Sequence, residues 1–525
     1  MNILKQKITL ALILLFAFSF KLFAYESISF TWRGGSFVIG STPGKLFTIN
    51  WGDGSAIETI TASEYNHFTN TYTNGYYLYT VTINALSNDC KFTIFSSTNN
   101  WNIGTLNSLN VANAPSLIVI ECWGHKLSAL DISKNTALTK LHCSHNQLKT
   151  LDVSKNIALT ILECGMNQIS ELILGNHTKL TILSCPENSI TSLDVSNCIA
   201  LELLECHKNK IVELDFSKSK NISLLDCSSN NLSNLNLVNN VALTELSCGG
   251  NKLKSLDVSK NTNLEFLGCS ANQITNIDVS KNLKLTIFSC GSNQLTTLDI
   301  SQNNYIEQLY CRNSGIMKIE VSPIATYREA FCCYNSRLPL SELYFLSERI
   351  KYESSKWFGT QRLDRKYITP ESIVDFSSQT EFGGIKTVFM VEKDGVPASE
   401  NDYTLIDDGV FKFDNIGDYT ITMTNDAIIS YWEYPPKVIA EISVREVGVA
   451  ETQHATSLHL YPNPVSNILY INLANTPTPP EVKIYSLQGV LLLQTQENQI
   501  DVSSLPAGFY VANVNGINRK IIKQL

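Results

Sequence analysis

A 21-residue spacing of apolar positions dominates the middle of the chain. From Leu117 to about Ala325, each unit approximates L-x-x-L-x-C-x-x-N-x-L-x-x-L-D-V-S-x-N-x-x, and residues 138–156 form a clean copy. A fixed period of this kind is typical of repeat architectures, in which each unit buries its apolar side by stacking on its neighbours. The pattern therefore predicts a mainly β fold built on a parallel solenoid of about 10–11 coils, with the Leu and Cys positions pointing inward.

Cysteine is the most regular member of the unit. Eleven cysteines follow one another at intervals of 21 residues, namely Cys122, Cys143, Cys164, Cys185, Cys206, Cys227, Cys248, Cys269, Cys290, Cys311 and Cys332. We expect buried thiols that act as small apolar side chains. Disulfides between coils would have acceptable distances but poor torsions, and one Cys per coil does not close a metal tetrahedron. Cys90, Cys198 and Cys333 lie off this series and could pair or stay free.

Each unit also contains a second, similar half, L-x-x-L-D-V-S-x-N, which predicts two short strands per coil and little helix. An Asn follows the first strand, and we expect it to bond backbone groups that the turn leaves unpaired; these residues are Asn146, Asn167, Asn188, Asn209, Asn230, Asn251, Asn272 and Asn293. The repeated Asp near the second strand, as in Asp131-x-Ser133-x-Asn135, has the opening spacing of a calcium loop but lacks its later Gly and Glu. Turn capping is the better interpretation.

Together these positions resemble the leucine-rich repeat, L-x-x-L-x-L-x-x-N/C-x-L, with Cys in place of the third Leu. The 21-residue form is similar to the bacterial IRREKO subclass. The resemblance covers about 210 residues and implies protein binding, although a fold by itself does not fix a function.

The segments around the repeats predict further domains. Residues 1–24 have the charged, apolar and small-residue order of a secretory signal peptide. Residues 25–96 contain W-G-D-G at 51–54 and an alternating strand near 77–83, and they resemble a polycystic-kidney-disease (PKD)-type β-sandwich. The solenoid with its N-terminal cap would occupy 97–337, a capping helix and connector 338–362, and an Ig-like β-sandwich 363–446.

The C-terminal residues 457–525 consist of short alternating strands separated by Pro, Gly and Asn turns. Tyr461-Pro-Asn-Pro, then Ile484-Tyr-Ser-Leu-Gln-Gly, then a run ending in Pro-Ala-Gly-Phe-Tyr510 and a basic terminus follow in order. This series resembles the type A C-terminal sorting domain of the bacterial type IX secretion system. The resemblance implies export to the outer cell surface through that machinery, with 447–456 as the linker.

The composition of the chain limits the kinds of partner that it is expected to bind. Lys and Arg total 40 against 48 Asp and Glu, a net charge of −8, and 44% of residues are hydrophobic. A chain this acidic has no overall electrostatic signature for nucleic acid, and its apolar content is too high for a disordered protein. No stretch after residue 24 approaches the length of a transmembrane span.

No catalytic signature occurs in the sequence. It has no H-E-x-x-H, G-x-S-x-G, P-loop or G-x-G-x-x-G motif, and the repeated Asp indicates architecture because an active site occurs once. We expect no enzyme activity, no cofactor and no metal site.

The outward position before each Cys departs from uniformity, with Glu121, His142, Glu163, Ser184, Glu205 and Asp226 on successive coils. Trp123, His125, His145 and His207 occupy nearby positions that we also expect to face outward. This column is interpretable as a solvated ladder, a ligand-contact patch or, least well, a metal site.

A second outward file, two positions earlier, is mostly apolar: Val119, Ile161, Ile182, Leu203, Leu224, Phe266 and Ile287. It would mark a partner surface if exposed, or an aliphatic ladder if covered.

The sequence thus predicts a secreted cell-surface protein that recognises a protein or glycan ligand on the solenoid face, without catalysis. The candidate contact residues are Glu121, Trp123, His142, His145, Glu163, His207 and Tyr310. The alternative is a structural rod or spacer without a dedicated ligand, because several coils are rather uniform.

Overall fold

The computed structural model describes residues 25–70, 77–97, 106–431 and 433–445 and, near the C-terminus, residues 458–461, 468–473, 481–486, 491–497, 499–506, 508–514 and 517–523. The expected signal peptide, 1–24, and the expected linker, 447–456, lie outside these residues. The chain divides into two compact units, Met1–Val444 and Arg445–Leu525.

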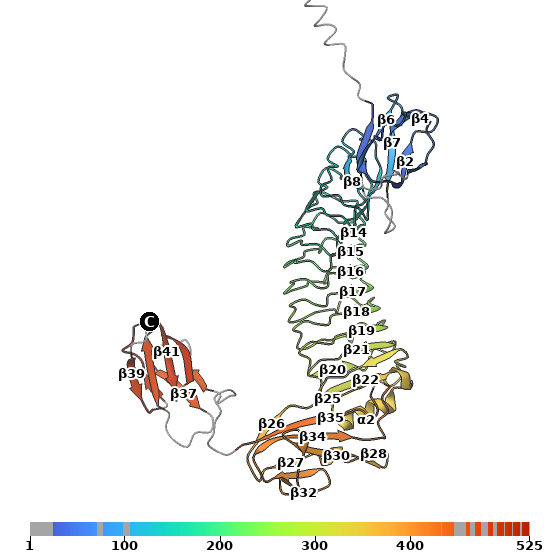
Figure 1. Cartoon of the computed structure of the whole chain (residues 1–525). Helices are drawn as coiled ribbons and strands as arrows, with labels where there is room; N and C mark the ends of the chain where they lie inside the picture. Colours follow the sequence, from blue (N-terminus) through green and yellow to red (C-terminus); the bar gives the residue numbers. More distant parts are fainter. Residues whose placement is uncertain are drawn as a thin grey trace, which may run out of the picture. The chain divides into compact units, whose positions relative to one another are not determined.

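Each solenoid coil begins with a short strand whose middle residue is buried while its two neighbours face outward. These strands stack in parallel, one per coil, along one side of the solenoid (Figure 1). Their bounds are β9 (Val119–Glu121), β10 (Lys140–His142), β12 (Ile161–Glu163), β14 (Ile182–Ser184), β15 (Leu203–Glu205), β16 (Leu224–Asp226), β17 (Glu245–Ser247), β18 (Phe266–Gly268), β19 (Ile287–Ser289), β21 (Gln308–Tyr310), β23 (Ala330–Cys332) and β24 (Lys356–Trp357). The predicted parallel β solenoid is confirmed.

The second strand of each coil was predicted throughout, and this is wrong. Within the described solenoid it forms only as two parallel pairs, β11 (Thr150–Asp152) with β13 (Glu171–Ile173) and β20 (Thr297–Ile300) with β22 (Lys318–Val321). In the other coils this segment is irregular. Its turns are held by aspartates, as where Asp131 Oδ1 accepts the Ser133 N–H at 2.9 Å. The predicted turn-capping role of Asp is therefore confirmed, and it holds also where the second strand forms, at Asp152 and Asp299.

The asparagine row after the first strand ties neighbouring coils together. Asn230 is representative: its Nδ2 donates to the carbonyl oxygens of Cys206 at 3.0 Å and Cys227 at 3.1 Å, and its Oδ1 accepts the Ile211 N–H at 2.9 Å. The same bonds recur from Asn146 to Asn293. Backbone groups that the turn would leave unpaired inside the protein are thus satisfied by one repeated side chain.

At each end of the asparagine row, a residue of another type makes the equivalent hydrogen bonds. At the start, His125 Nε2 lies 2.8 Å from the Ser97 carbonyl oxygen, while its Nδ1 accepts the Leu106 N–H at 3.2 Å. His125 is buried, so the expectation that it faces outward is wrong: it stands 21 residues before Asn146 and takes the place of an Asn. At the far end Gln361 bonds the carbonyl oxygens of Cys333 and Phe358 and the Ser336 N–H.

A second buried row runs along the opposite side of the coils, also at intervals of 21 residues. Its amides donate to two carbonyl oxygens of the preceding coil, as Asn261 does to Leu237 and Asn240. The members are Asn135, Asn156, His177, Cys198, Ser219, Asn240, Asn261, Asn282 and Asn303. Cys198, which lies off the cysteine series, is therefore a member of this row.

All fourteen cysteines are buried free thiols. One detail of the predicted cysteine series is wrong at its end. Cys332 pairs in register with the outward Tyr310, and the Cys333 N–H donates to Trp357 O as the Cys311 N–H donates to Cys332 O. One extra residue before this strand shifts the register, so Cys333 takes the inward position and Cys332 lies on the outward column.

Before the solenoid, eight strands form two layers with an aromatic core. Their bounds are β1 (Ser27–Trp32), β2 (Gly35–Ser41), β3 (Leu46–Asn50), β4 (Glu58–Thr61), β5 (Asn66–Asn70), β6 (Tyr79–Ala85), β7 (Phe92–Ser96) and β8 (Leu106–Asn110). One sheet has the order β4-β3-β6-β1-β8, and the other strands, β7, β2 and β5, extend the solenoid sheet beyond β9 into a 15-stranded sheet. The core of this region is therefore continuous with that of the coils.

The W-G-D-G motif forms the turn after β3. Trp51 is buried, and its Nε1 donates to Glu58 Oε1 at 2.7 Å. Gly52 adopts φ 77°, and a Cβ there would meet the Thr80 carbonyl oxygen, whereas Gly54, at φ 87°, faces open space. The first glycine is thus required by close backbone approach as well as by conformation.

After the last coils, helix α2 (Leu340–Arg349) packs Leu343 and Leu346 against the end of the core (Figure 1). Its Glu342 accepts the Ile319 N–H at 3.0 Å, a group that a further coil would otherwise bond. Two 3-10 turns, η1 (Glu353–Ser355) and η2 (Ser377–Gln379), follow. The helix thereby covers the open edge of β22.

The following strands form a six-stranded sheet, β25-β35-β34-β30-β31 with β26 also on β35, and smaller sheets β27-β33-β32 and β28-β29. Their bounds are β25 (Gln361–Arg362), β26 (Lys366–Ile368), β27 (Ile373–Asp375), β28 (Glu381–Phe382), β29 (Ile385–Lys386), β30 (Val388–Lys393), β31 (Val396–Pro397), β32 (Tyr403–Asp407), β33 (Val410–Phe413), β34 (Gly417–Thr424) and β35 (Val438–Val444).

The second compact unit contains the antiparallel sheets β36-β37-β40 and β39-β38-β41-β42 around a small core that includes Leu469, Val482 and Ile484. Its strands are β36 (Leu458–Tyr461), β37 (Ile468–Leu473), β38 (Val482–Ser486), β39 (Leu491–Thr495), β40 (Gln499–Asp501), β41 (Gly508–Val514) and β42 (Ile517–Lys523).

Candidate ligand-binding face

The outward side chains of the 15-stranded sheet form two parallel columns. Because each strand is in register with the next, every coil places one residue in each column. The aliphatic column consists of Val119, Lys140, Ile161, Ile182, Leu203 and Leu224, and the acidic column of Glu121, His142, Glu163, Ser184, Glu205 and Asp226. All these side chains are half-buried. Side chains one coil apart in a column are about 4.8 Å from each other along the solenoid.

At the first coils the acidic column is tightly connected. Lys140 Nζ lies 2.7 Å from Glu121 Oε1, and Ser96 Oγ donates to Glu121 Oε2 at 2.9 Å. His142 Nδ1 lies 3.5 Å from Glu163 Oε2, and the Trp123 ring stacks on His142 with centroids 5.9 Å apart. The structure therefore brings Glu121, Trp123, His142 and Glu163 together.

Burial changes the pKa values of Glu121 and His142. Burial raises the pKa of Glu121, but the hydrogen bonds from Lys140 and Ser96 outweigh it and bring the pKa below its usual value. Burial lowers the pKa of His142, against the opposing effect of Glu163. The column is thus a set of carboxylates with a neutral imidazole between them at neutral pH.

Further along the column the acids contact a hydroxyl group and an imidazole. Ser184 Oγ donates to Glu205 Oε2 at 2.8 Å, and His207 Nδ1 lies 3.2 Å from Asp226 Oδ2. Within the described residues, the ion pairs of Glu163, Glu205 and Asp226 include neither Lys nor Arg. Three carboxylates therefore keep their charge largely uncompensated on this face.

His145 lies two residues after Cys143, and its backbone is in the left-handed region with φ 55°. The same conformation recurs at Met166, Glu187, Lys208, Ser229, Ala271, Ser292 and Asn313, with Gly124 and Gly250 in the same place. His145 is half-buried at the turn that follows the sheet, and its position is set by this repeated turn.

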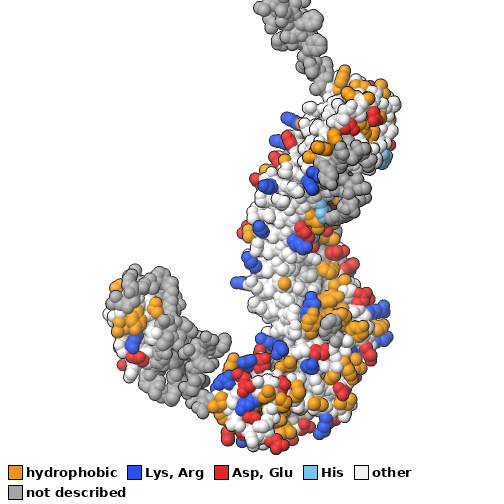
Figure 2. Space-filling model, viewed as in Figure 1, with side chains coloured by type: hydrophobic (Ala, Val, Ile, Leu, Met, Phe, Trp, Pro, Cys, Tyr) orange, Lys and Arg blue, Asp and Glu red, His pale blue; other side chains and the backbone are white. Residues whose placement is uncertain are grey.

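Tyr310 does not join the other candidates. Eight strand steps separate β10 from β21, which is about 38 Å along the solenoid. Between these two strands, the residues of the acidic column after Asp226 are Ser247, Gly268 and Ser289. Figure 2 shows a flank of the solenoid that is made mostly of uncharged side chains and backbone. The candidate residues therefore divide into two places on one sheet.

Residues around Tyr310 were missed from the sequence. Arg312 and Tyr334 interact, with the guanidinium carbon 5.6 Å from the ring centroid, and the Trp357 ring lies 6.1 Å from that of Tyr431. A signal was present, because Arg312 occupies a position that is Ser or Gly in the three preceding coils.

No set of three or more His, Cys, Asp or Glu side chains arranged to hold a metal ion occurs in the part of the chain that the structure describes. In the same residues, none of the helices has the length and apolarity needed to cross a membrane.

Comparison with known proteins identifies the second compact unit. Residues 459–525 match the family model of the secretion system C-terminal sorting domain. A comparison of the sequence with curated proteins finds no significant match.

Among solved structures, the functional domain of InlJ from Listeria monocytogenes, described as including a cysteine ladder, is 22% identical with a TM-score of 0.50, covering 67% of this chain and 86% of that one. The internalin InlF from Listeria monocytogenes is 19% identical with a TM-score of 0.39, covering 49% of this chain and 84% of that one. YopM from Yersinia enterocolitica is 22% identical with a TM-score of 0.35, covering 43% of this chain and 53% of that one.

The fold and its cysteine series define a leucine-rich-repeat solenoid protein, similar in fold to the InlJ domain. The C-terminal unit is a type IX secretion sorting domain, which marks the chain as secreted to the outer cell surface of a bacterium. The predicted repeat class, sorting domain and location are thus confirmed, while the PKD-like and Ig-like assignments of the flanking domains stay predictions.

Proposed function

We propose that this protein is a non-catalytic recognition protein that binds a protein ligand through the aliphatic and acidic columns of coils β9 to β16. The C-terminal domain engages the type IX secretion machinery and delivers the solenoid to the cell surface.

The observation that carries this proposal is the pairing of the two columns. Five aliphatic side chains keep part of their surface open beside Glu163, Glu205 and Asp226, which lack cationic partners in the described face. Apolar contact supplies most of the free energy of protein association, while charge complementarity selects the partner and speeds encounter. The expected ligand is therefore a protein surface with apolar side chains beside Lys or Arg.

Selection from displayed random peptides tests the proposal. We expect the immobilised full chain to enrich peptides rich in Lys or Arg and aliphatic residues, with affinity that falls as salt rises. The triple variant Glu163→Gln, Glu205→Gln, Asp226→Asn should lower the affinity of the selected peptides about tenfold.

A matched control removes the same charge elsewhere. The control is the triple variant Asp215→Asn, Asp257→Asn, Asp278→Asn. These aspartates accept a backbone N–H in the repeated turns, and Asn can accept the same bond, so this variant should leave peptide binding unchanged. Equal loss in both variants would contradict a specific face. A chain that selects no peptide would favour the structural rod, and one that binds only glycans on an array would overturn the choice of ligand class.

A further inference from the structure

A second cluster of aromatic and basic side chains, half-buried at Tyr310 and Trp357 and exposed at Tyr431, lies at the other end of the solenoid, independent of the face proposed above. The outward column, small at Ser247, Gly268 and Ser289, becomes aromatic at Tyr310 and, after Cys332, at Trp357. Tyr310 and Trp357 are two strand steps apart, about 10 Å, on the same side of the sheet. The Tyr431 ring, 65% exposed, continues this row beside Trp357.

The aromatic row adjoins a polar pocket through three consecutive pairs of residues on neighbouring coils. Arg312 donates to Tyr334 Oη, Asn335 Nδ2 donates to Asn313 Oδ1 at 3.0 Å, and Ser314 and Ser336 share a hydroxyl hydrogen bond of 3.1 Å. The last two pairs supply Ser314, Asn335 and Ser336 to the pocket lining. The pocket therefore begins directly beside the Arg312–Tyr334 pair.

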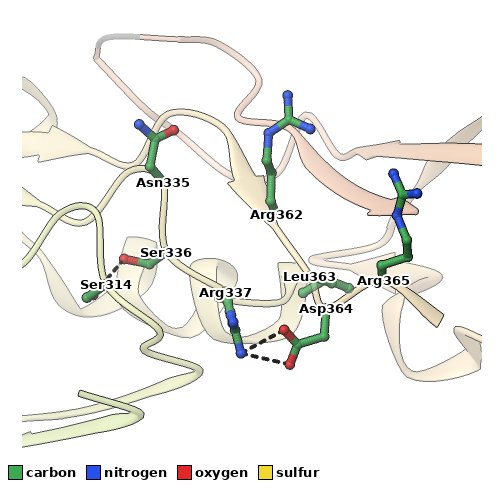
Figure 3. A pocket seen from close by; sticks show the side chains of 8 residues that line it. All are labelled: Ser314, Asn335, Ser336, Arg337, Arg362, Leu363, Asp364 and Arg365. Carbon is green, nitrogen blue, oxygen red and sulfur yellow. Dashed lines mark hydrogen bonds and ion pairs between the residues drawn. The ribbon is translucent and has the colours of Figure 1, made fainter. Parts of the chain in front are cut away.

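The pocket has a volume of about 490 Å³ and is lined by Ser314, Asn335, Ser336, Arg337, Arg362, Leu363, Asp364 and Arg365 (Figure 3). Arg337 pairs with Asp364 on one side of it, while the Arg362 and Arg365 guanidinium groups extend on the other. Both of these arginines share a single carboxylate, that of Glu441, at 3.4 and 2.6 Å.

The charge of this cluster is the reverse of that of the chain. With Arg312, four guanidinium groups stand against three carboxylates, those of Asp364, Glu441 and Glu329, the last of which bonds Gln308 beside Tyr310, whereas the whole chain has a net charge of −8. Arg362 uses one of its five N–H donors for a long contact with Glu441. The other N–H donors of this planar guanidinium group are thus available to bond carboxylate or sulfate oxygens.

We propose that this junction binds an acidic saccharide, with sugar rings on Tyr310, Trp357 and Tyr431 and a carboxylate or sulfate group in the arginine pocket. The C–H faces of a pyranose are apolar and stack on aromatic rings, while its hydroxyl groups reach the exposed Asn335 at the side. The separation of Tyr310 and Trp357 is similar to the length of a disaccharide, and the excess of arginine selects an anionic chain.

A peptide ligand fits this cluster less well. Tyr310 and Trp357 are half-buried and Tyr431 is 65% exposed, so these rings keep accessible surface, whereas protein hot spots are fully desolvated in well-packed pockets. The pocket beside them is lined almost entirely by polar and charged side chains.

Isothermal titration of the full chain with an oligogalacturonate, a sulfated heparin oligosaccharide, a neutral cello-oligosaccharide of equal length and inorganic sulfate tests the proposal. At least one acidic chain should bind about tenfold more tightly than the neutral one, with affinity that falls as salt rises. The double variant Arg362→Gln, Arg365→Gln should lower this affinity about tenfold and weaken its salt dependence. Tyr310→Ala with Tyr431→Ala should lower it similarly without changing the salt dependence.

Three controls make the result decisive. Lys252→Gln with Lys254→Gln removes the same charge from exposed positions on other coils, and Trp123→Ala removes an aromatic ring at the far end; neither should change saccharide binding. Far-ultraviolet circular dichroism and the thermal midpoint show that each variant is folded. No saccharide binding, equal binding of acidic and neutral chains, or binding of sulfate alone with the tyrosine variants unaffected would each overturn the proposal. The peptide selection above addresses the other face, so the two proposals fail separately.

Discussion

Gln361 bonds the Cys333 carbonyl oxygen at 3.1 Å through Nε2, in the way that Asn293 bonds that of Cys269 at 3.0 Å. The last rung of the asparagine row is therefore supplied by β25, the first strand of the six-stranded sheet that follows helix α2, and not by the repeats. The solenoid and that sheet share one hydrogen-bonded row. This relationship makes the junction part of the folding unit, in agreement with the single compact unit up to Val444.

Replacing Gln361 by Leu should destabilise this unit by about 3 kcal/mol, because the Ser336 N–H and the Cys333 carbonyl are buried without partners. Urea unfolding followed by circular dichroism measures the change. Gln499→Leu, at an exposed position of the sorting domain, is the control and should leave the main transition unchanged. A loss below about 0.5 kcal/mol would mean that the junction does not contribute to stability.

The two buried histidines should make stability depend on pH. Burial lowers the pKa of both His125 and His177, which take asparagine places in their rows. Above about pH 6.5 both the folded and the unfolded chains hold neutral imidazoles, and the stability is complete. As the pH falls below that value, the unfolded chain takes up protons that the folded chain does not, so stability is lost until the lowered folded pKa is reached.

The double variant His125→Asn, His177→Asn supplies the matched test, because Asn fits the same bonds. Thermal midpoints at pH 8 and at pH 5 should differ clearly less in this variant than in the parent chain. An equal acid shift in both proteins would assign the pH dependence to other groups, such as the surface carboxylates.

The two glycines of the W-G-D-G turn should respond differently to alanine. Gly54→Ala adds only the cost of a left-handed residue, about 1 kcal/mol, since open space surrounds it. Gly52→Ala also forces a Cβ against the Thr80 carbonyl and should cost about 3 kcal/mol. Chemical unfolding of the two variants measures the difference, and equal costs would mean that the contact with β6 relaxes freely.

The thiols should be unreactive in the native protein. All fourteen are buried, and burial raises the pKa of Cys143 and Cys227 to about 12, so almost no thiolate forms at neutral pH. Ellman's reagent should therefore titrate no thiol before unfolding and all fourteen in guanidinium chloride. A fast-reacting native thiol would locate a coil that opens.

The regularity of the sequence accounts for what could be predicted. The inward Leu and Cys positions and the outward columns follow from a strict period, because a one-residue shift would bury Glu163 and expose Leu162. Where the period is interrupted, prediction fails: an extra residue before β23 exchanges the places of Cys332 and Cys333. His125 was misplaced although it stands 21 residues before Asn146, because its residue type differs from Asn and its equivalent role is shown by its two hydrogen bonds.

The site was less accessible to sequence reasoning. The column of Glu121, His142 and Glu163 follows from the repeat, but the aromatic cluster near Tyr310 combines three regions of the chain. Trp357 and Tyr431 lie beyond the repeats, and no local pattern indicates that they reach the same sheet face.

The direction of the hydrogen bonds between coils has a mechanical consequence. Bonds of a parallel sheet are evenly spaced and slanted, and in this solenoid they connect each coil to the next along its axis. Tension applied between the two ends of the solenoid would act on all these coil-to-coil contacts in series, so that the coils would open one at a time. Each coil that opens releases 21 residues, about 70 Å of extended chain. At a cell surface exposed to flow, such a protein would lengthen stepwise at low force and act as an extensible tether.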